Sequence, residues 1–253
     1  YWFSHQQSNY GQADIHTRAR ADLGERCVYW LNALLRLRLP PARVLELGSA
    51  HGGFVHLMRQ AGFEAEGCEL SPSICQIARE TFGVPMRQGP VEDQSIAPGR
   101  LDVVVLMDVL EHLPNPRATL ASCARLLKED GILLIQTPRY PEGETLEKLE
   151  ARGDRFIAQL KPLEHLYLFS CQSVERLMRS VGLPVVSFLP AIYAFYDMFL
   201  VASRGAIAPV DDAARWGHFS RSPQLRTIQA MLDAEDRFRD LLGKHRALLA
   251  AGR

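Results

Sequence analysis

The sequence has little of what marks several classes of protein. Lys and Arg number 29 and Asp and Glu also number 29, so the 253-residue chain has no surplus charge of either sign. A protein that binds mainly nucleic acid needs an excess of basic residues to neutralise phosphates. Hydrophobic residues make up 47% and charged residues 23%, which excludes a disordered chain and fits a globular one. We therefore expect no nucleic-acid partner.

The chain has five cysteines, and no two of them form a C-x-x-C motif. Their odd number and wide spacing favour neither a disulfide framework nor a zinc ribbon. The N-terminus does not begin with Met and lacks a basic segment followed by an apolar one, as a secretory signal would have. These features predict a cytoplasmic protein and leave open a fragment of a longer chain. The five cysteines are Cys27, Cys68, Cys75, Cys123 and Cys171.

Long apolar runs are also rare. One stretch, Val185 to Ala202, is almost entirely apolar, but it contains Pro190 and Asp197. A membrane helix needs about 20 apolar residues without such interruptions. The stretch is therefore predicted to form two buried strands joined at a turn, with no membrane span.

Short apolar strands alternate with amphipathic helices from residue 43 onward. Such alternation implies βαβ units and predicts a doubly wound α/β fold, with a mostly parallel sheet that ends in an antiparallel pair. The run LDVVVLM at 101–107 is typical of a parallel strand buried on both faces. Strands are predicted at 43–47, 64–69, 85–88, 101–107 and 131–136, and helices at 51–61, 71–82, 116–127 and 172–181.

The ends of the chain differ from this pattern. Residues 1–203 are predicted to form one domain, in which residues 1–40 are a helical extension. Residues 204–253 are expected to be a loop-like linker, to residue 222, followed by an amphipathic helix. That helix could join two copies of the chain, link it to a larger polypeptide, or pack on its own domain.

The segment Val44 to Phe54 runs from a strand through a glycine-rich loop into a helix. Its spacing, Gly48-x-x-x-Gly52, is neither a dinucleotide fingerprint nor a Walker loop. Glu46, near the strand end, would repel a phosphate and attract a cation. Glu69 ends the next strand, where an acid can accept hydrogen bonds from ribose hydroxyls. A positively charged nucleoside is indicated.

These residues resemble a class I S-adenosylmethionine-dependent methyltransferase. The resemblance covers residues 40–202 and rests on E-x-G-x-x-x-G at Glu46 to Gly52, on Glu69, and on two later segments, GPVED at 89–93 and MDVLEHL at 107–113. It implies a seven-stranded Rossmann-like sheet with S-adenosyl-L-methionine as cofactor. The implied cofactor-binding residues are Glu46, Gly48, Ser49, Gly52, Glu69, Leu70, Val91, Glu92, Asp108 and Val109.

Within that set, the resemblance places the glycine loop at the amino-acid part of the cofactor and Asp108 near the sulfonium. Val91 and Glu92 would flank the adenine. Plainer roles stay open: the glycines can simply permit a tight turn, Asp108 can cap the next helix, and Val91 can belong to the core.

The acceptor side offers two histidines. A hydroxyl is a poor nucleophile and needs a base, and imidazole titrates in the useful range. The predicted catalytic residues are His165, His112 and Glu164, with Glu164 or Glu111 orienting a ring. The segment Glu164 to Ser170, E-H-x-x-x-F-S, resembles methyltransferases that act on sugars and quinone precursors. No firm metal-ligand spacing stands out, so no obligatory metal is expected.

The resemblance favours methyl transfer to a hydroxyl of a saccharide or other small molecule, of the kind made in bacterial glycan biosynthesis. A quinone or aromatic hydroxyl is the second acceptor class, and a cofactor-binding scaffold without catalysis is the third reading. The insertion at 142–161 and the aromatic residues of the N-terminus, Tyr1, Trp2, Phe3 and Tyr10, are predicted to cover the acceptor.

Overall fold

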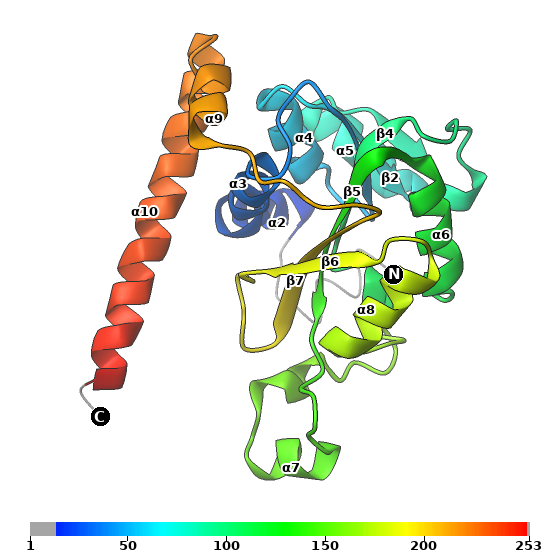
Figure 1. The fold of residues 1–253 in the computed structure, drawn as a ribbon, viewed down its shortest axis with the longest axis vertical. Coiled ribbons are helices and arrows are strands. Elements are labelled where there is room, and N and C mark those ends of the chain that lie inside the picture. Colours follow the sequence, from blue (N-terminus) through cyan, green and yellow to red (C-terminus); the bar gives the residue numbers. More distant parts are fainter. Residues whose placement is uncertain (1–13, 252–253) are drawn as a thin grey trace.

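Seven strands form one mixed sheet in the computed structural model, which describes residues 14–251 (Figure 1). The strand order is β3-β2-β1-β4-β5-β7-β6, and β7 alone runs antiparallel to its neighbours. The predicted doubly wound α/β sheet with an antiparallel terminal strand is therefore confirmed. The strands are β1 (Arg43–Leu47), β2 (Glu64–Glu69), β3 (Met86–Gln88), β4 (Leu101–Met107), β5 (Leu127–Pro138), β6 (Val185–Leu189) and β7 (Asp197–Ser203).

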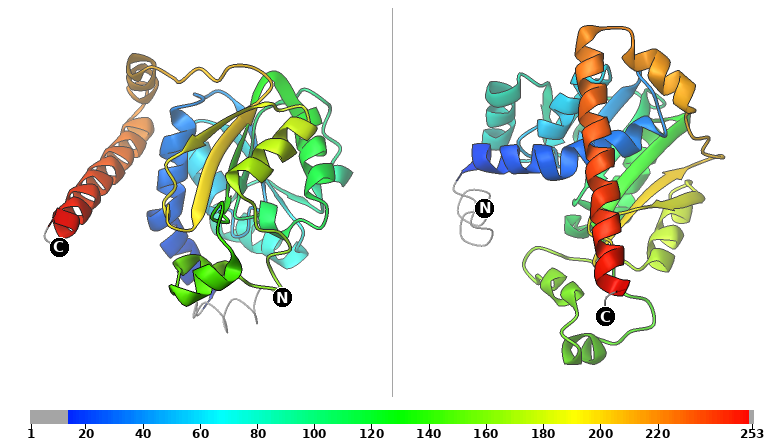
Figure 2. Two further views of the ribbon diagram at one scale, coloured as in Figure 1. Left: turned by 60° about the horizontal axis from the view of Figure 1, so that its bottom comes forward. Right: turned by 90° about the vertical axis from the view of Figure 1, so that its left-hand side faces the viewer.

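Helices cover both faces of the sheet, each over its own hydrophobic cluster (Figure 2). One cluster joins the sheet to η1 (Leu23–Cys27), α3 (Val28–Leu35), α4 (Gly53–Gln60) and α5 (Pro72–Phe82), and α2 (Ile15–Asp22) directly precedes η1. The other joins it to α6 (Pro116–Leu126) and α8 (Cys171–Ser180). Every residue of β4, at the centre, is buried, as its unbroken apolar run predicts.

Local sequence signals set several helix starts. Ser71 caps α5, where its side chain accepts a hydrogen bond from the Ile74 amide at 3.4 Å, and Pro72 fills the first turn. Asn115 caps α6 in the same way, followed by Pro116. These caps fix the residue at which each helix begins. They thereby set where the loop after the preceding strand ends.

Two predicted segments differ from the structure. The helical extension expected within residues 1–40 is interrupted by the π-helical turn η1. The insertion at 142–161 contains two short helices, α7 (Leu146–Ala151) and η4 (Arg155–Gln159). The prediction of a loop over 204–222 is wrong, because α9 (Asp212–Phe219) forms there. Asp211 caps α9, and the Nε2 of His218 donates a hydrogen bond to the Ala61 carbonyl at 2.8 Å. The cap and the hydrogen bond to Ala61 stabilise α9. The helix is too short for its apolar periodicity to be recognised in the sequence.

The last helix, α10 (Pro223–Ala251), packs on its own domain through its first half. Leu232 is fully buried, and Asp236 accepts a hydrogen bond from Asn32 of α3 at 2.7 Å. Further along, Phe238 and Leu241 are more than half exposed. The right-hand view of Figure 2 shows α10 extending across the helices and past them. Own-domain packing thus accounts for the first half, and a dimer or linker contact stays a prediction for the second.

Among residues 14–251, no helix is both long enough and apolar enough to cross a membrane. The apolar run that ends at Ala202 instead supplies β6 and β7, the strand pair that its interruptions predict.

Candidate active site

The glycine loop after β1 needs residues without bulky side chains. Gly48 has a φ of +63°, and a Cβ there would lie 2.5 Å from Val109 Cγ2. Gly52, at the start of α4, has a φ of +79°. Both positions favour glycine, since other residues rarely adopt this conformation. Ser49 is buried, with its Oγ 3.8 Å from Met86 Sδ, so its side chain packs beneath the loop.

Two buried glutamates stand at the ends of β1 and β2. Glu46 is only 4% exposed, and its Oε2 has no hydrogen-bond partner among the described residues. Burial raises the pKa of Glu46 well above its usual range, although the Val55 amide opposes this. Glu69 accepts hydrogen bonds from the backbone amides of Ala50 at 3.2 Å and Ser71 at 3.1 Å. Glu69 therefore ties the glycine loop to the end of β2.

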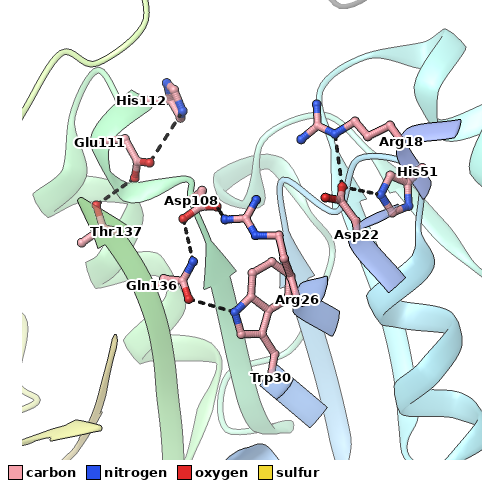
Figure 3. Close-up of polar contacts among 10 residues, drawn as sticks. All are labelled: Arg18, Asp22, Arg26, Trp30, His51, Asp108, Glu111, His112, Gln136 and Thr137. Carbon is pink, nitrogen blue, oxygen red and sulfur yellow. Dashed lines mark hydrogen bonds and ion pairs between the residues drawn. The ribbon is translucent and has the colours of Figure 1, made fainter. Parts of the chain in front are cut away.

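Asp108 follows β4 in a left-handed conformation, with a φ of +57°. Its carboxylate pairs with Arg26 of η1, and its second oxygen accepts from the Gln136 amide at 3.1 Å (Figure 3). Gln136 in turn accepts from the Trp30 indole at 2.9 Å. These contacts hold a strained residue in place at the edge where the sheet's parallel strands end. The network crosses from β5 to the N-terminal helices.

Arg26 lies in the π-helical turn, a feature often found at functional sites. Burial alone would lower the pKa of this guanidinium, but the charges of Asp108, Asp22 and Asp197 raise it further above its ordinary value. The side chain also lies over the Trp30 ring, 5.0 Å from the ring centroid. Arg26 is therefore a permanently charged partner for carboxylates from three parts of the chain.

His51 of the glycine loop is fixed by two contacts. Its Nδ1 accepts from the Gly53 amide at 3.0 Å, so Nε2 carries the hydrogen and donates to Asp22 at 3.0 Å. Arg18 approaches the same Asp22 oxygen at 3.2 Å, as Figure 3 shows. Burial opposes ionisation of Asp22, yet these contacts outweigh it and lower the pKa. The glycine loop is thus joined to α2.

A second group of side chains lies after β4, in and beyond η3 (Leu110–His112). Glu111 is 1% exposed and accepts from the Thr137 hydroxyl at 2.8 Å. The rings of His112 and His165 meet edge to face, with centroids 5.0 Å apart. Burial, with a contribution from His112, lowers the pKa of His165. The two predicted histidines are therefore neighbours, although 53 positions separate them in the chain.

The predicted partner of these histidines acts through its backbone. His112 Nδ1 lies 2.7 Å from the carbonyl oxygen of Glu164, and His165 Nδ1 lies 2.8 Å from that of Gln159. The nearest carboxylate to His112 is Glu111, whose Oε1 is 3.8 Å from Nε2. Of the two glutamates predicted to orient a ring, Glu111 brings its carboxylate to the histidines and Glu164 brings its carbonyl.

Two carboxyl groups here have strongly raised pKa values. Burial and the charge of Asp108 raise the pKa of Glu111 to about 8. Burial and the same charge raise the pKa of Asp197, the first residue of β7, to about 8, although Arg26 opposes the shift. The Oδ2 atom of Asp197 has no partner among the described residues. Groups of this kind often mark functional sites.

Asp197→Asn is expected to stabilise the fold increasingly as pH rises above about 4. The raised pKa means that the folded state holds a proton that the unfolded chain releases near pH 3.8, so stability falls as pH rises toward about 8. Removing the charge should raise the free energy of unfolding by about 1–3 kcal/mol at pH 8.5 and change it little at pH 4. Urea unfolding at both values measures this, with exposed Asp93→Asn as the control. An equal gain at both pH values would contradict it.

The remaining predicted residues occupy different surroundings. Val91 is 3% exposed and belongs to a hydrophobic cluster, which favours its reading as a core residue. Glu92 is exposed, and its carboxylate accepts from Thr119 of α6 at 2.5 Å. Leu70 is 68% exposed beside Glu69. Val109 packs partly against the same cluster as Val91. The N-terminal aromatic residues, Tyr1 to Phe3 and Tyr10, lie outside the described residues.

Sequence reasoning missed much of this network. Asp22, Arg26 and Asp197 carry no local motif, since they stand in helical or strand sequence and act through distant partners. Gln136 and Thr137 could have been found from the sequence, because two polar residues end the apolar run of β5.

A hollow lined in part by Arg38, Asp130 and Arg204 lies at the opposite edge of the sheet, where the parallel strands begin. Its lining includes no predicted site residue.

Comparison with known proteins now decides the family. The profile of the family described as "Methyltransferase domain" matches residues 18–188, which is well over half of the chain. The chain belongs to this methyltransferase family. The predicted enzyme class is thereby confirmed, with S-adenosylmethionine as the cofactor. The matched range includes β1 to β5 and every residue predicted for the site.

Individual relatives agree with this methyltransferase assignment. The chain is 35% identical over 134 residues to a protein named ubiquinone biosynthesis O-methyltransferase from Xanthomonas campestris pv. campestris, covering 50% of this chain and 55% of that one. The chain thus spans about half the length of the curated relatives it matches.

Solved structures share the fold. Magnesium protoporphyrin IX methyltransferase from Synechocystis PCC 6803, determined with bound SAH, superposes with a TM-score of 0.57 at 19% identity, over 81% of this chain and 94% of that one. A Haloferax volcanii methyltransferase in complex with the Trm112 methyltransferase activator gives 0.59 at 18% identity, over 75% and 94%. At such identities the likeness concerns the fold alone.

Proposed function

We propose that this methyltransferase transfers a methyl group to a hydroxyl of a saccharide or another small molecule. The observation that carries the proposal is the pairing of His112 with His165 beside Glu111, at the same edge of the sheet as the glycine loop and Asp108. A poor nucleophile such as a hydroxyl needs activating groups of this kind, whereas an amine or thiolate needs them less.

The residues around the glycine loop fit the cofactor. The unpartnered Oε2 of buried Glu46 is a polar atom that a bound group can satisfy. Glu69 and Asp108 bring carboxylates to the ends of β2 and β4, and acidic side chains at this edge of the sheet favour a cationic ligand. We assign Gly48, Ser49 and Gly52 to the loop that approaches the amino-acid part of the cofactor.

The other cofactor contacts are proposed from position. Glu69 keeps free lone pairs on both carboxylate oxygens after its two backbone hydrogen bonds, so it can also accept from ribose hydroxyls. Exposed Leu70 offers an apolar surface for the adenine ring. Because the Glu92 side chain is held by Thr119, the backbone near Val91 is the better partner for the exocyclic amine. Val109 packs against Gly48 and sets the width of the loop.

Bound S-adenosylmethionine supplies a methyl group on a cationic sulfur, and its transfer to a hydroxyl forms an O–C bond, breaks the S–C bond, leaves the electron pair on sulfur and releases one proton. The chain contributes alignment and charge. Asp108, held by Arg26 and Gln136, presents a fixed carboxylate at the end of β4. The cluster of Glu111, His112 and His165 activates the hydroxyl and directs its proton away.

The insertion between β5 and His165 lies on the acceptor side. Phe156 is fully buried there and meets Tyr140 edge to face, with ring centroids 5.2 Å apart. The Gln159 carbonyl of the same insertion fixes His165. We propose that this segment, seen below the sheet around α7 in Figure 1, forms one wall of the acceptor pocket and orients His165.

A phenolic hydroxyl of a quinone precursor is the second candidate acceptor. The relatives named ubiquinone biosynthesis O-methyltransferase favour it, since their similarity reaches 35% identity. A scaffold that binds the cofactor without catalysis is the remaining alternative, and it would have no use for a paired histidine cluster.

Calorimetric titration with S-adenosylmethionine and with its demethylated product tests the proposal first. Binding of both in the micromolar range should be followed by methyl transfer when sugar and phenol acceptors are screened with labelled cofactor. Transfer to amines alone would overturn a hydroxyl acceptor. Cofactor binding without transfer to any acceptor would support the scaffold.

A further inference from the structure

Three ligand-type atoms converge beside the acceptor site. Glu111, His112 and His165 each offer one metal-ligating atom, and these atoms all lie within 4.8 Å of one another. Glu111 and His112 come from η3, after β4, whereas His165 comes from the loop before α8. Two backbone hydrogen bonds, from the amides of Leu166 and Tyr167 to the Glu111 carbonyl, hold the two segments together.

The hydrogen bonds of the two rings leave the same nitrogen free. Each Nδ1 lies within 2.8 Å of a backbone carbonyl oxygen, which accepts only, so each Nδ1 carries the hydrogen and donates. In the neutral rings each Nε2 is then left with a lone pair. A backbone carbonyl that accepts from one ring nitrogen is the usual support for a histidine that ligates a metal through the other.

A hydrogen bond also orients the carboxylate of Glu111. The Thr137 hydroxyl donates to Oε2 of Glu111 at 2.8 Å, which leaves Oε1 directed toward the histidines, 3.8 Å from His112 Nε2. Three acceptor atoms that face one another repel, and a cation between them would remove this repulsion. One divalent ion can accept a lone pair from all three atoms at once.

We propose that Glu111, His112 and His165 form a binding site for a first-row divalent transition metal ion such as Zn²⁺. Two imidazole nitrogens and one carboxylate oxygen suit such ions, while Mg²⁺ prefers oxygen ligands. Ligands of tetrahedral zinc lie about 3.4 Å apart, so small rotations of the partly exposed histidines would close the site. The proposal departs from the expectation of no obligatory metal, which was based on the lack of a local spacing motif.

The inference deepens the proposed hydroxyl methylation and rests on it for its role in the reaction. His112 and His165 are both partly exposed, so one side of the site is open to a further ligand. A metal ion there would lower the pKa of an acceptor hydroxyl in contact with it. The proton would then pass to water, and the cluster would act through the ion instead of as a simple base.

Ion binding can be measured without any acceptor. The chain, stripped with a chelator, is titrated with ZnCl₂ by calorimetry and with CoCl₂ by visible absorption. We expect one ion per chain, with a Kd of about 1 μM or tighter. His112→Ala, His165→Ala and Glu111→Gln should each weaken binding about 100-fold or more, because each removes a ligand. The exposed helical His16→Ala is the matched control and should bind as the parent chain does.

Thr137→Val tests the support of the site without removing a ligand. It deletes the hydroxyl that orients Glu111 and should weaken Zn²⁺ binding about 10- to 100-fold. Circular dichroism and the Kd for S-adenosylmethionine establish that each variant is folded. Absence of ion binding by the parent chain, or equal binding by the parent and by His112→Ala and His165→Ala, would overturn the site.

The two proposals fail in different ways. Zinc binding that depends on the three residues, without methyl transfer to any hydroxyl acceptor, would reject the proposed function and support the metal site. Methyl transfer that survives chelation, in a chain that binds no ion, would reject the metal site and support the proposed function.

Discussion

His165→Ala is expected to lower turnover about 10²- to 10⁴-fold, the usual contribution of a group that activates a hydroxyl. The Kd for S-adenosylmethionine should stay within about threefold, because His165 lies beyond β5 while the proposed cofactor residues lie at the ends of β1 to β4. Single-turnover methyl transfer, measured with the acceptor found by screening, gives the rate. Calorimetry gives the Kd.

Two variants make this result specific. His16→Ala removes an exposed histidine from α2 and should leave both quantities unchanged. His165→Asn keeps a side-chain donor that can reach the Gln159 carbonyl but lacks the second ring nitrogen, so it should be as slow as the alanine variant. Restored turnover in the asparagine variant would show that His165 only supports the loop. Loss of cofactor binding in the alanine variant would remove it from the acceptor side.

Glu69→Ala is expected to weaken S-adenosylmethionine binding by about 1–3 kcal/mol, or roughly 5- to 150-fold, as for loss of a buried charged hydrogen-bond acceptor. Two effects combine. The ribose would lose its proposed partner, and the amides of Ala50 and Ser71 would lose theirs, which loosens the glycine loop. Calorimetric titration with the cofactor and with its product measures the change.

Glu66→Ala provides the matched control on the same strand. Glu66 pairs with Arg87 and is exposed enough that its loss should not reach the glycine loop. Its Kd for the cofactor should therefore equal that of the parent chain. An unchanged Kd in Glu69→Ala would remove Glu69 from the site, whatever the control shows.

Most of the fold could be predicted because its signals are local. The strands at 43–47, 64–69 and 101–107 were predicted at their observed bounds, since apolar runs bounded by turn residues define them. Prediction failed for α9, an eight-residue helix whose stability depends on its cap and on buried Phe219. It also failed for the interruption at η1, because nothing in a helical period signals a π turn.

The candidate site likewise contains residues that the sequence could predict and residues that it could not. The carboxylates and glycines after β1, β2 and β4 could be predicted, because parallel strands end at one edge of a sheet and a strand end is visible in the sequence. The partners of Asp108 could not. Arg26 is 82 positions away and Gln136 is 28 positions away, and no motif joins them.

By itself the sequence determined the order of strands and helices, the glycine loop and the acids that follow the strands, since each depends on neighbours a few residues apart. Only the tertiary structure brought Arg26 to Asp108 and placed His165 beside His112 and Glu111. The physical reason is that such contacts depend on the path of the long connections between elements. Local periodicity does not constrain that path, whereas packing of the helices and the insertion against the sheet does.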